Sequence, residues 1–400
     1  MLFLIALLSV AGFAWYVMSP DERRRLLDAA RGQVGILGRG VLANLDACRP
    51  YLDALRTRMP HPVVASAVAA TYVLVFAGTG ASAGSDTLVR WGATFGPRTA
   101  NGEWWRLITA LFLHQGLLSL VLHVLVVVQL GMIVERLFGH ATFAIVFAAG
   151  GVLANSIHLA AHPTAVRTGA SGGLYALYGL LIAWTVQGLR EPSDLAIPRP
   201  ALRLLAPVAC VFVLTSIVSD TGAFAANIAA LTVGAVAGFV VASKVPDALP
   251  APGRVAAVAG SALAVVAFMA VPSIGTVDVR PEIARVVALE AQTAAPYGKA
   301  VEQFRRGTTS AEALAKMIDS GILPAFREAE ARLDALHGVP PEHRSLVADA
   351  ERYVRLRRES WDLRARALHA SNMRMLRAAD NKERESLDAL EQLQATRSGR

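Results

Sequence analysis

The stretch Arg167-Thr168-Gly169-Ala170-Ser171-Gly172-Gly173-Leu174-Tyr175 opens an apolar segment that is long enough to cross a bilayer. It places one hydroxyl, that of Ser171, between glycines at the start of that segment. Polar side chains are costly in lipid, so a polar group at such a place is a candidate for chemistry. Ser171 can act as a nucleophile only if a neighbouring group takes its proton.

The composition places much of the chain in a membrane. Hydrophobic residues make up 54% of the 400 residues, and about 20 consecutive apolar residues are needed to cross the hydrocarbon core. Eight segments qualify as candidate spans, namely 2–18, 62–79, 114–133, 141–161, 170–188, 204–219, 223–243 and 254–272. The first is interpreted as an uncleaved anchor, because no basic residue precedes it and no cleavage signal follows it.

Arginine is concentrated in the connections on one side of these spans, above all in the segment 19–61, which contains the run Arg23-Arg24-Arg25. Positively charged connections stay in the cytoplasm, so the amino terminus and the region after the last span are expected outside. We therefore expect a multi-pass membrane protein in this orientation. Its expected location is a bacterial inner membrane. The net charge of +8 is then an orientation signal, and no nucleic acid partner is expected.

Four parts are expected along the chain. They are an anchor with a basic segment (1–61), a membrane domain (62–243), an additional span (244–272) and a soluble helical region (273–400). In the last part, apolar residues from Leu346 to Ala367 recur at helical spacings between charged ones. Gly338-Val339-Pro340-Pro341 should interrupt the helices. This pattern favours an antiparallel helical hairpin, used for packing or for assembly with a helical partner.

The cysteines and most histidines have plain structural explanations. Cys48 lies in a charged segment and Cys210 inside an expected span, so no disulfide is expected. His158 and His162 are four residues apart, as two metal ligands on a helix could be, but no third ligand stands near them in the sequence. We expect neither a metal nor a cofactor.

Polar residues recur inside other spans. Gln115, Ser119 and His123 are spaced by four residues, which predicts one face of a helix that also carries His114. Asn227 lies near the outer end of a later span. Gly234 and Gly238 follow it in a pattern of small residues that lets helices approach closely. Each has a structural explanation too, because serine and glycine are common where membrane helices pack.

Together these motifs resemble the rhomboid family of intramembrane serine proteases, over residues 62–243. The resemblance implies an all-α polytopic membrane bundle with a six-helix core and an extra helix at each end, followed here by the soluble helical region. The residues that carry it are Glu103-Trp104-Trp105-Arg106, Phe112-Leu113-His114, Leu130-Gly131 with Glu135 and Gly139, Gly169-Ala170-Ser171-Gly172 with Tyr175 and Gly179, and Asn227-Ile228-Ala229-Ala230 with Gly234 and Gly238.

The resemblance also implies a reaction and partners. Ser171 matches the nucleophile that attacks a peptide bond of a transmembrane helix within the lipid bilayer, and a histidine takes its proton. Gly169 matches the position that keeps the backbone close, and Tyr175 the ring that supports the histidine. His114 matches one of the polar groups around the oxyanion.

Three positions depart from the family pattern. Asn227 stands where the family has its basic histidine, and an amide does not accept a proton from serine near neutral pH. On the helix that normally supplies oxyanion donors, Ser119 stands in place of histidine and His123 in place of asparagine.

Two interpretations of these departures stay open. In the first, the protein is a pseudoprotease that binds transmembrane segments with impaired or absent cleavage. In the second, it is an active serine endopeptidase with His123 as a relocated base and Asn227 as an orienting group or oxyanion donor. A role in transport would predict paired charges or broken helices in mid-membrane, which the sequence lacks.

Overall fold

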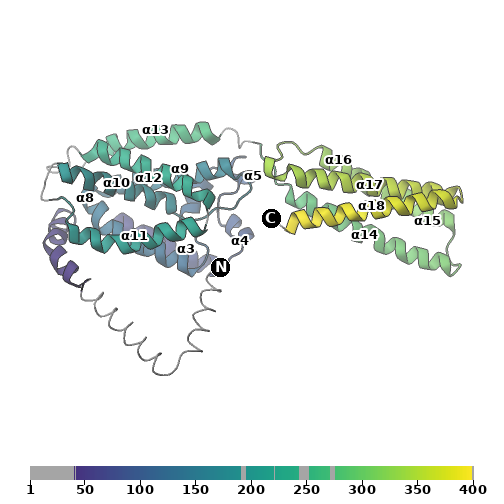
Figure 1. The fold of residues 1–400 in the computed structure, drawn as a ribbon, viewed down its shortest axis with the longest axis horizontal. Helices are drawn as coiled ribbons and strands as arrows, with labels where there is room; N and C mark the ends of the chain where they lie inside the picture. Colours follow the sequence, from purple (N-terminus) through teal and green to yellow (C-terminus); the bar gives the residue numbers. More distant parts are fainter. Residues whose placement is uncertain are drawn as a thin grey trace, which may run out of the picture. The chain divides into compact units, whose positions relative to one another are not determined.

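The computed structural model describes residue 40 and residues 42–190, 195–219, 221–242, 252–270 and 275–398. Regular structure in this part of the chain is helical throughout, and the only β-pairing there is an isolated bridge between Thr94 and Arg167 (Figure 1). The expected all-α class is confirmed. The first expected span, 2–18, lies outside the described residues.

The chain divides into two compact units. The first comprises Met1–Gly92, Ile108–Ser156 and Thr168–Ala267, and the second Ala93–Leu107, Ile157–Arg167 and Phe268–Arg400. Two connections of the membrane domain, 93–107 and 157–167, therefore group with the C-terminal region.

The helices of the first unit are α3 (Val63–Thr79), α4 (Ser85–Arg90), η1 (Ala110–Phe112), α7 (Leu117–Leu130), η2 (Gly131–Glu135), α8 (Arg136–Phe138), α9 (His140–Ala161), α10 (Ser171–Arg190), α11 (Arg199–Ser219), α12 (Thr221–Ala242) and α13 (Pro252–Ala270). Five described helices are long and apolar enough to cross a membrane, and the pair Leu42–Arg58 and Val63–Thr79, bent by 96°, would make a sixth. The expected segment 254–272 is helical as α13, but α13 is not among these candidate spans.

One expected helix begins later than the sequence pattern suggested. Gly116 has a φ of +86°, which favours glycine, and α7 starts only at Leu117. His114 and Gln115 therefore precede the helix, and the prediction that both lie on it with Ser119 is wrong. The span expected at 114–133 instead runs from Leu117 to Phe138.

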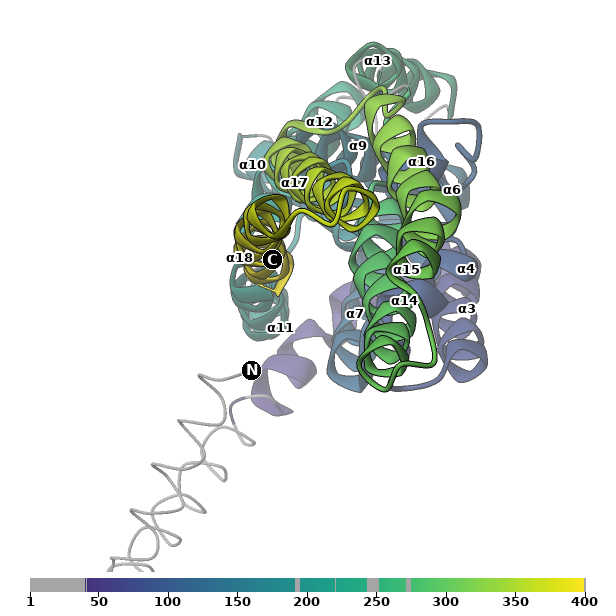
Figure 2. The same cartoon turned by 90° about the vertical axis from the view of Figure 1, so that its right-hand side faces the viewer.

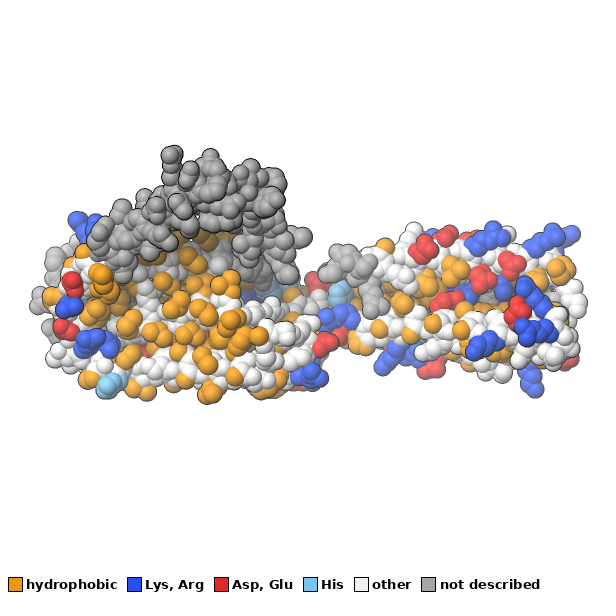
Figure 3. All heavy atoms as spheres, turned by 90° about the horizontal axis from the view of Figure 1, so that it is seen from below, with side chains coloured by type: hydrophobic (Ala, Val, Ile, Leu, Met, Phe, Trp, Pro, Cys, Tyr) orange, Lys and Arg blue, Asp and Glu red, His pale blue; other side chains and the backbone are white. Residues whose placement is uncertain are grey.

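Exposed side chains of this unit are largely apolar. Leu74, Leu118 and Val218 have 72%, 74% and 81% of their surface exposed, and Figure 3 shows hydrophobic side chains gathered over the part that contains the spanning helices. Contiguous exposed apolar surface of this kind marks a membrane-facing protein. The chain is an integral multi-pass membrane protein.

The carboxylate of Glu135 stabilises the start of α3. Glu135 is fully buried, and its two oxygens each accept a hydrogen bond of 2.8 Å from the backbone N–H groups of Val64 and Ala65. The first N–H groups of a helix have no partner within it, and they favour a negative charge. Glu135 thereby joins η2 to the first turn of α3.

The second unit contains the short helix α5 (Gly96–Thr99) and a bundle built from the C-terminal region. Its helices are α14 (Arg280–Arg305), α15 (Ala311–Met317), η4 (Ile318–Ile322), α16 (Leu323–Asp334), η5 (Pro341–His343), α17 (Arg344–His369) and α18 (Met373–Ser398). The expected break at 338–341 is confirmed between α16 and α17. The region is larger than the expected hairpin, because α17 and α18 pack along each other and also with α14, α15 and α16 (Figure 2).

An ion-pair network lies inside this bundle. The guanidinium of Arg357, 1% exposed, donates to the Glu290 carboxylate at 2.8 and 2.6 Å and lies 2.9 Å from Glu383. Its carbon also lies 4.6 Å from the centre of the Trp361 ring. A buried pair of this kind tolerates the loss of one partner poorly, so it fixes how α14, α17 and α18 fit together.

Candidate functional site

Ser171 is the first residue of α10, and the backbone before it takes a sharp turn. Gly169 has a φ of +100°, a conformation that side chains disfavour, and its N–H donates to the carbonyl oxygen of Ala110 at 2.8 Å. The N–H of Leu174 donates to Ala170, which closes the first helical turn. Gly169 therefore allows the chain to turn into α10 while its N–H stays bonded to Ala110 of η1.

Close packing of α10 on α12 brings a second polar residue to Ser171. A Cβ on Gly179 would lie 2.0 Å from the carbonyl oxygen of Leu231, and one on Gly234 would lie 1.9 Å from that of Ala176. Only glycine permits this backbone contact. The expected close approach through Gly234 is confirmed.

Asn227 on α12 is the polar group that this packing places beside the serine. The Ser171 hydroxyl donates a hydrogen bond of 3.2 Å to Asn227 Oδ1, and Asn227 is only 1% exposed. Asn227 thus lies where a base would receive the serine proton. An amide oxygen accepts a hydrogen bond but does not take the proton away.

His123 approaches from α7. Its Nδ1 lies 2.8 Å from the carbonyl oxygen of Ser119. A carbonyl can only accept, so the neutral ring carries its proton on Nδ1 and has a lone pair on Nε2. Nε2 is buried, no described residue forms a hydrogen bond with it, and it lies 3.8 Å from where a Cβ on Gly169 would be. His123 therefore faces the serine loop without a hydrogen bond to Ser171.

An aromatic chain links the remaining site residues. The His114 ring centre lies 4.6 Å from that of Tyr72 and 4.8 Å from that of His123. Phe212 of α11 contacts both His123 and Tyr175, with ring centres 5.4 Å apart in each pair. The predicted residues His114, His123 and Tyr175 thus belong to one continuous row of ring contacts.

Sequence reasoning missed Tyr72 and Phe212. Both lie in apolar spans, where an aromatic residue is indistinguishable from ordinary packing, so no local pattern could have identified them. His158 and His162 contact each other with ring centres 5.2 Å apart. Among the described residues, no group of three His, Cys, Asp or Glu side chains could hold a metal ion.

Known proteins resemble the part of the chain that carries this site. Residues 101–244 match the family model of the Rhomboid domain. The Rhomboid protease GluP of Bacillus subtilis (strain 168) is 35% identical over 105 residues, which cover 26% of this chain and 20% of GluP. Rhomboid-like protease 2 of Toxoplasma gondii is 35% identical over 99 residues, covering 24% of this chain and 35% of that protein.

A plant protein adds a third similarity. RHOMBOID-like protein 6, mitochondrial, of Arabidopsis thaliana is 32% identical over 108 residues, 26% of this chain and 35% of its own length. The chain thus matches only 20% to 35% of the length of these three relatives. The residues that match the family model, 101–244, include the serine turn, α7, α10 and α12. Residues 101–244 of this chain are therefore similar to the Rhomboid domain and to known rhomboid proteases.

Proposed function

We propose that this protein binds transmembrane helices through its rhomboid domain and cleaves them poorly or not at all. The observation that carries this proposal is the hydrogen bond from Ser171 to Asn227 Oδ1. The serine is in place, but its partner is an amide. Losing a catalytic base costs about 10³- to 10⁶-fold in rate, which is enough to make cleavage negligible.

A second candidate function is supported by His123. Its Nε2 carries a lone pair, faces the serine loop and has no hydrogen-bond partner among the described residues. A shift that brought Nε2 within about 3 Å of the serine oxygen would make it a general base. Asn227 would then orient the hydroxyl or donate to the oxyanion, and the protein would be an active serine endopeptidase.

We also propose that the protein resides in a bacterial cell membrane with its C-terminal region outside. The arginine-rich connections support this orientation. The contacts of Asn101 and Thr164 with C-terminal residues support it as well. Thr164 lies in the connection that leads to Ser171, and in this orientation that connection is on the outer side of the membrane. Resemblance to a Bacillus protein supports the bacterial membrane.

The test uses the full chain in lipid vesicles with a fluorogenic transmembrane reporter and a fluorophosphonate probe for reactive serines. We expect weak or no labelling of the wild type, binding of the reporter helix by both the wild type and Ser171→Ala, and labelling that appears in Asn227→His. If Asn227→His stays unlabelled although its reporter binding is intact, replacement of the base is not what limits cleavage.

The same assay separates the two candidate functions. Cleavage by the wild type that is lost in Ser171→Ala and in His123→Ala, but only reduced in Asn227→Ala, would establish His123 as the base. A wild type that binds the reporter without cleaving it supports the pseudoprotease. Failure to bind the reporter helix would contradict both.

A further inference from the structure

The connection between α5 and α6 (Arg106–Thr109) is held by residues that come much later in the chain. Asn101 donates from Nδ2 to the carbonyl oxygen of Thr276 at 2.9 Å, and its Oδ1 accepts from the N–H of Gly275 at 2.8 Å. One amide side chain thus pairs with both a donor and an acceptor of the segment that leads into α14. Only an amide side chain offers both groups in this arrangement.

The segment that leads into α14, Gly275–Val277, also contacts Gly338. The N–H of Val277 donates to the carbonyl oxygen of Gly338 at 3.3 Å. Gly338 has a φ of +75°, and a Cβ there would lie 2.1 Å from the carbonyl oxygen of Gly275. The segment Gly275–Val277 is therefore bonded to Asn101 and also packed against the turn that precedes α17.

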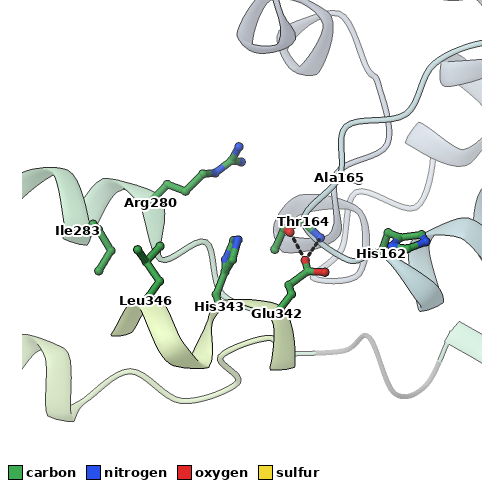
Figure 4. Close-up of a pocket in the computed structure, with 8 residues that line it drawn as sticks. All are labelled: His162, Thr164, Ala165, Arg280, Ile283, Glu342, His343 and Leu346. Atoms are coloured by element: carbon green, nitrogen blue, oxygen red, sulfur yellow. Dashed lines mark hydrogen bonds between the residues drawn. The ribbon is translucent and has the colours of Figure 1, made fainter. Parts of the chain in front are cut away.

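A second attachment joins the connection after α9 to η5. The carboxylate of Glu342 accepts hydrogen bonds from both the N–H and the hydroxyl of Thr164, as Figure 4 shows. Nearby, the Arg280 guanidinium lies 4.7 Å over the ring of Phe95. We call the contacts of Asn101 and Thr164 with the C-terminal region the loop clamp.

The two clamped connections are also paired with each other. Thr94 and Arg167 exchange two backbone hydrogen bonds of 3.1 and 3.0 Å, and the N–H of Gly96 donates to the carbonyl oxygen of Pro163 at 2.8 Å. The chain runs from Arg167 through Thr168, Gly169 and Ala170 to Ser171. Only three residues separate this pairing from the serine, so a change in the pairing can reach Ser171 along the chain.

The loop clamp consists of polar contacts and borders a cavity. A cavity of about 570 Å³ lies beside it, lined by His162 and Thr164 on one side and by Arg280, His343 and Leu346 on the other (Figure 4). The attachment thus depends on individual hydrogen bonds, each worth about a tenfold change in an equilibrium constant. Contacts of this kind open far more readily than a packed helix bundle.

We propose that the loop clamp couples the C-terminal helical region to the segment that positions Ser171. With the clamp closed, the C-terminal region holds the paired connections and the turn at Gly169 in place. With the clamp released, that pairing loosens and the start of α10 gains freedom. The coupling operates whether or not the protein cleaves peptide bonds, so its test does not depend on the proposed function.

The test measures amide hydrogen exchange in the full chain, embedded in lipid nanodiscs. The variant is Asn101→Ala combined with Glu342→Ala, which removes both attachments. The control is Arg366→Ala, which breaks an exposed ion pair with Asp362 within α17 and leaves the clamp intact. The reporting amides are those of Thr94, Gly96 and Arg167, which form backbone hydrogen bonds between the paired connections, and that of Gly169, which donates to the carbonyl oxygen of Ala110.

We expect the reporting amides to exchange about tenfold faster in the double variant than in the control, while amides within α17 keep their protection. Reporting amides that stay protected, with faster exchange confined to Gly275, would overturn the proposal. A single Glu342→Gln variant keeps an acceptor for Thr164 and should exchange at close to the wild-type rate.

A further variant covers the case in which the double variant unfolds the helical region. Thr164→Val removes the hydroxyl donor from the membrane-domain side and leaves every C-terminal residue unchanged. Faster exchange at Arg167 and Gly169 in Thr164→Val, with α17 still protected, supports the coupling. Unchanged exchange at both amides rejects it.

Discussion

Replacing Gly234 by alanine tests whether contact between α10 and α12 holds the site together. A Cβ at this position would lie 1.9 Å from the carbonyl oxygen of Ala176 and 2.6 Å from its carbonyl carbon. Ordinary contacts begin near 3.4 Å, so the two backbones would have to separate by about 1.5 Å. The obstacle is main chain, which cannot rotate aside as a long side chain could.

The expected magnitude follows from two opposed effects. Alanine in place of glycine within a helix is favourable by about 0.5–1 kcal/mol. Forcing extra atoms into a close contact costs about 1–3 kcal/mol and sometimes more, and separation also loses contacts along the rest of both helices. We therefore expect Gly234→Ala to lower the free energy of unfolding by about 1–3 kcal/mol.

The matched control is Gly260→Ala in α13, where no atom lies within 4 Å of the added Cβ. Thermal unfolding of the full chain in detergent, followed by circular dichroism, compares the two variants. Gly260→Ala should unfold at or above the wild-type temperature, and Gly234→Ala below it. Equal unfolding temperatures for the two variants would refute the reasoning from close helix contact.

Three further predictions concern charged groups. Arg357→Met leaves the partly buried carboxylate of Glu290 without its guanidinium partner and should destabilise the helical region by about 3–5 kcal/mol, measured as lost amide protection and restored by the added change Glu290→Leu. Burial raises the pKa of Glu282, but hydrogen bonds from Arg332 and Arg285 outweigh this effect and lower the pKa below its ordinary value of 4.5. The ionised carboxylate therefore stabilises the fold above pH 4.5, and this contribution is lost as the pH falls further. The unfolding temperature of Glu282→Gln should thus fall less in acid than that of the wild type. Glu135→Ala should lower the free energy of unfolding by about 1–3 kcal/mol, seen in denaturant titration, because the N–H groups of Val64 and Ala65 lose their acceptor.

The spans of the membrane domain could be predicted closely from composition. The segment expected at 62–79 is α3 (Val63–Thr79), and the one expected at 141–161 is α9 (His140–Ala161). An apolar run of this length is stable only as a helix in lipid, because every backbone polar group must then be paired within the segment.

Helix starts and long-range polar contacts could not be predicted in the same way. α7 begins after Gly116 because of that residue's positive φ, which an apolar pattern does not reveal. The bonds from Asn101 to Gly275 and Thr276 join positions more than 170 residues apart in the chain. Nothing in the sequence around a single asparagine indicates which distant residues it bonds. The grouping of two membrane-domain connections with the C-terminal region therefore cannot be predicted from the sequence.

The two positions from which a base could reach Ser171, 227 and 123, differ in how the fold holds them. Asn227 lies on α12, whose backbone contacts α10 directly through Gly179 and Gly234, so any residue at position 227 keeps its distance from the serine. His123 lies on α7, and its ring is held by the carbonyl of Ser119 and by neighbouring aromatic rings. The distance from a base at position 123 to Ser171 would therefore depend on how side chains pack between α7 and α10. Substitutions at Phe212, which contacts both His123 and Tyr175, should then alter activity if His123 is the base and leave an engineered Asn227→His activity largely unchanged.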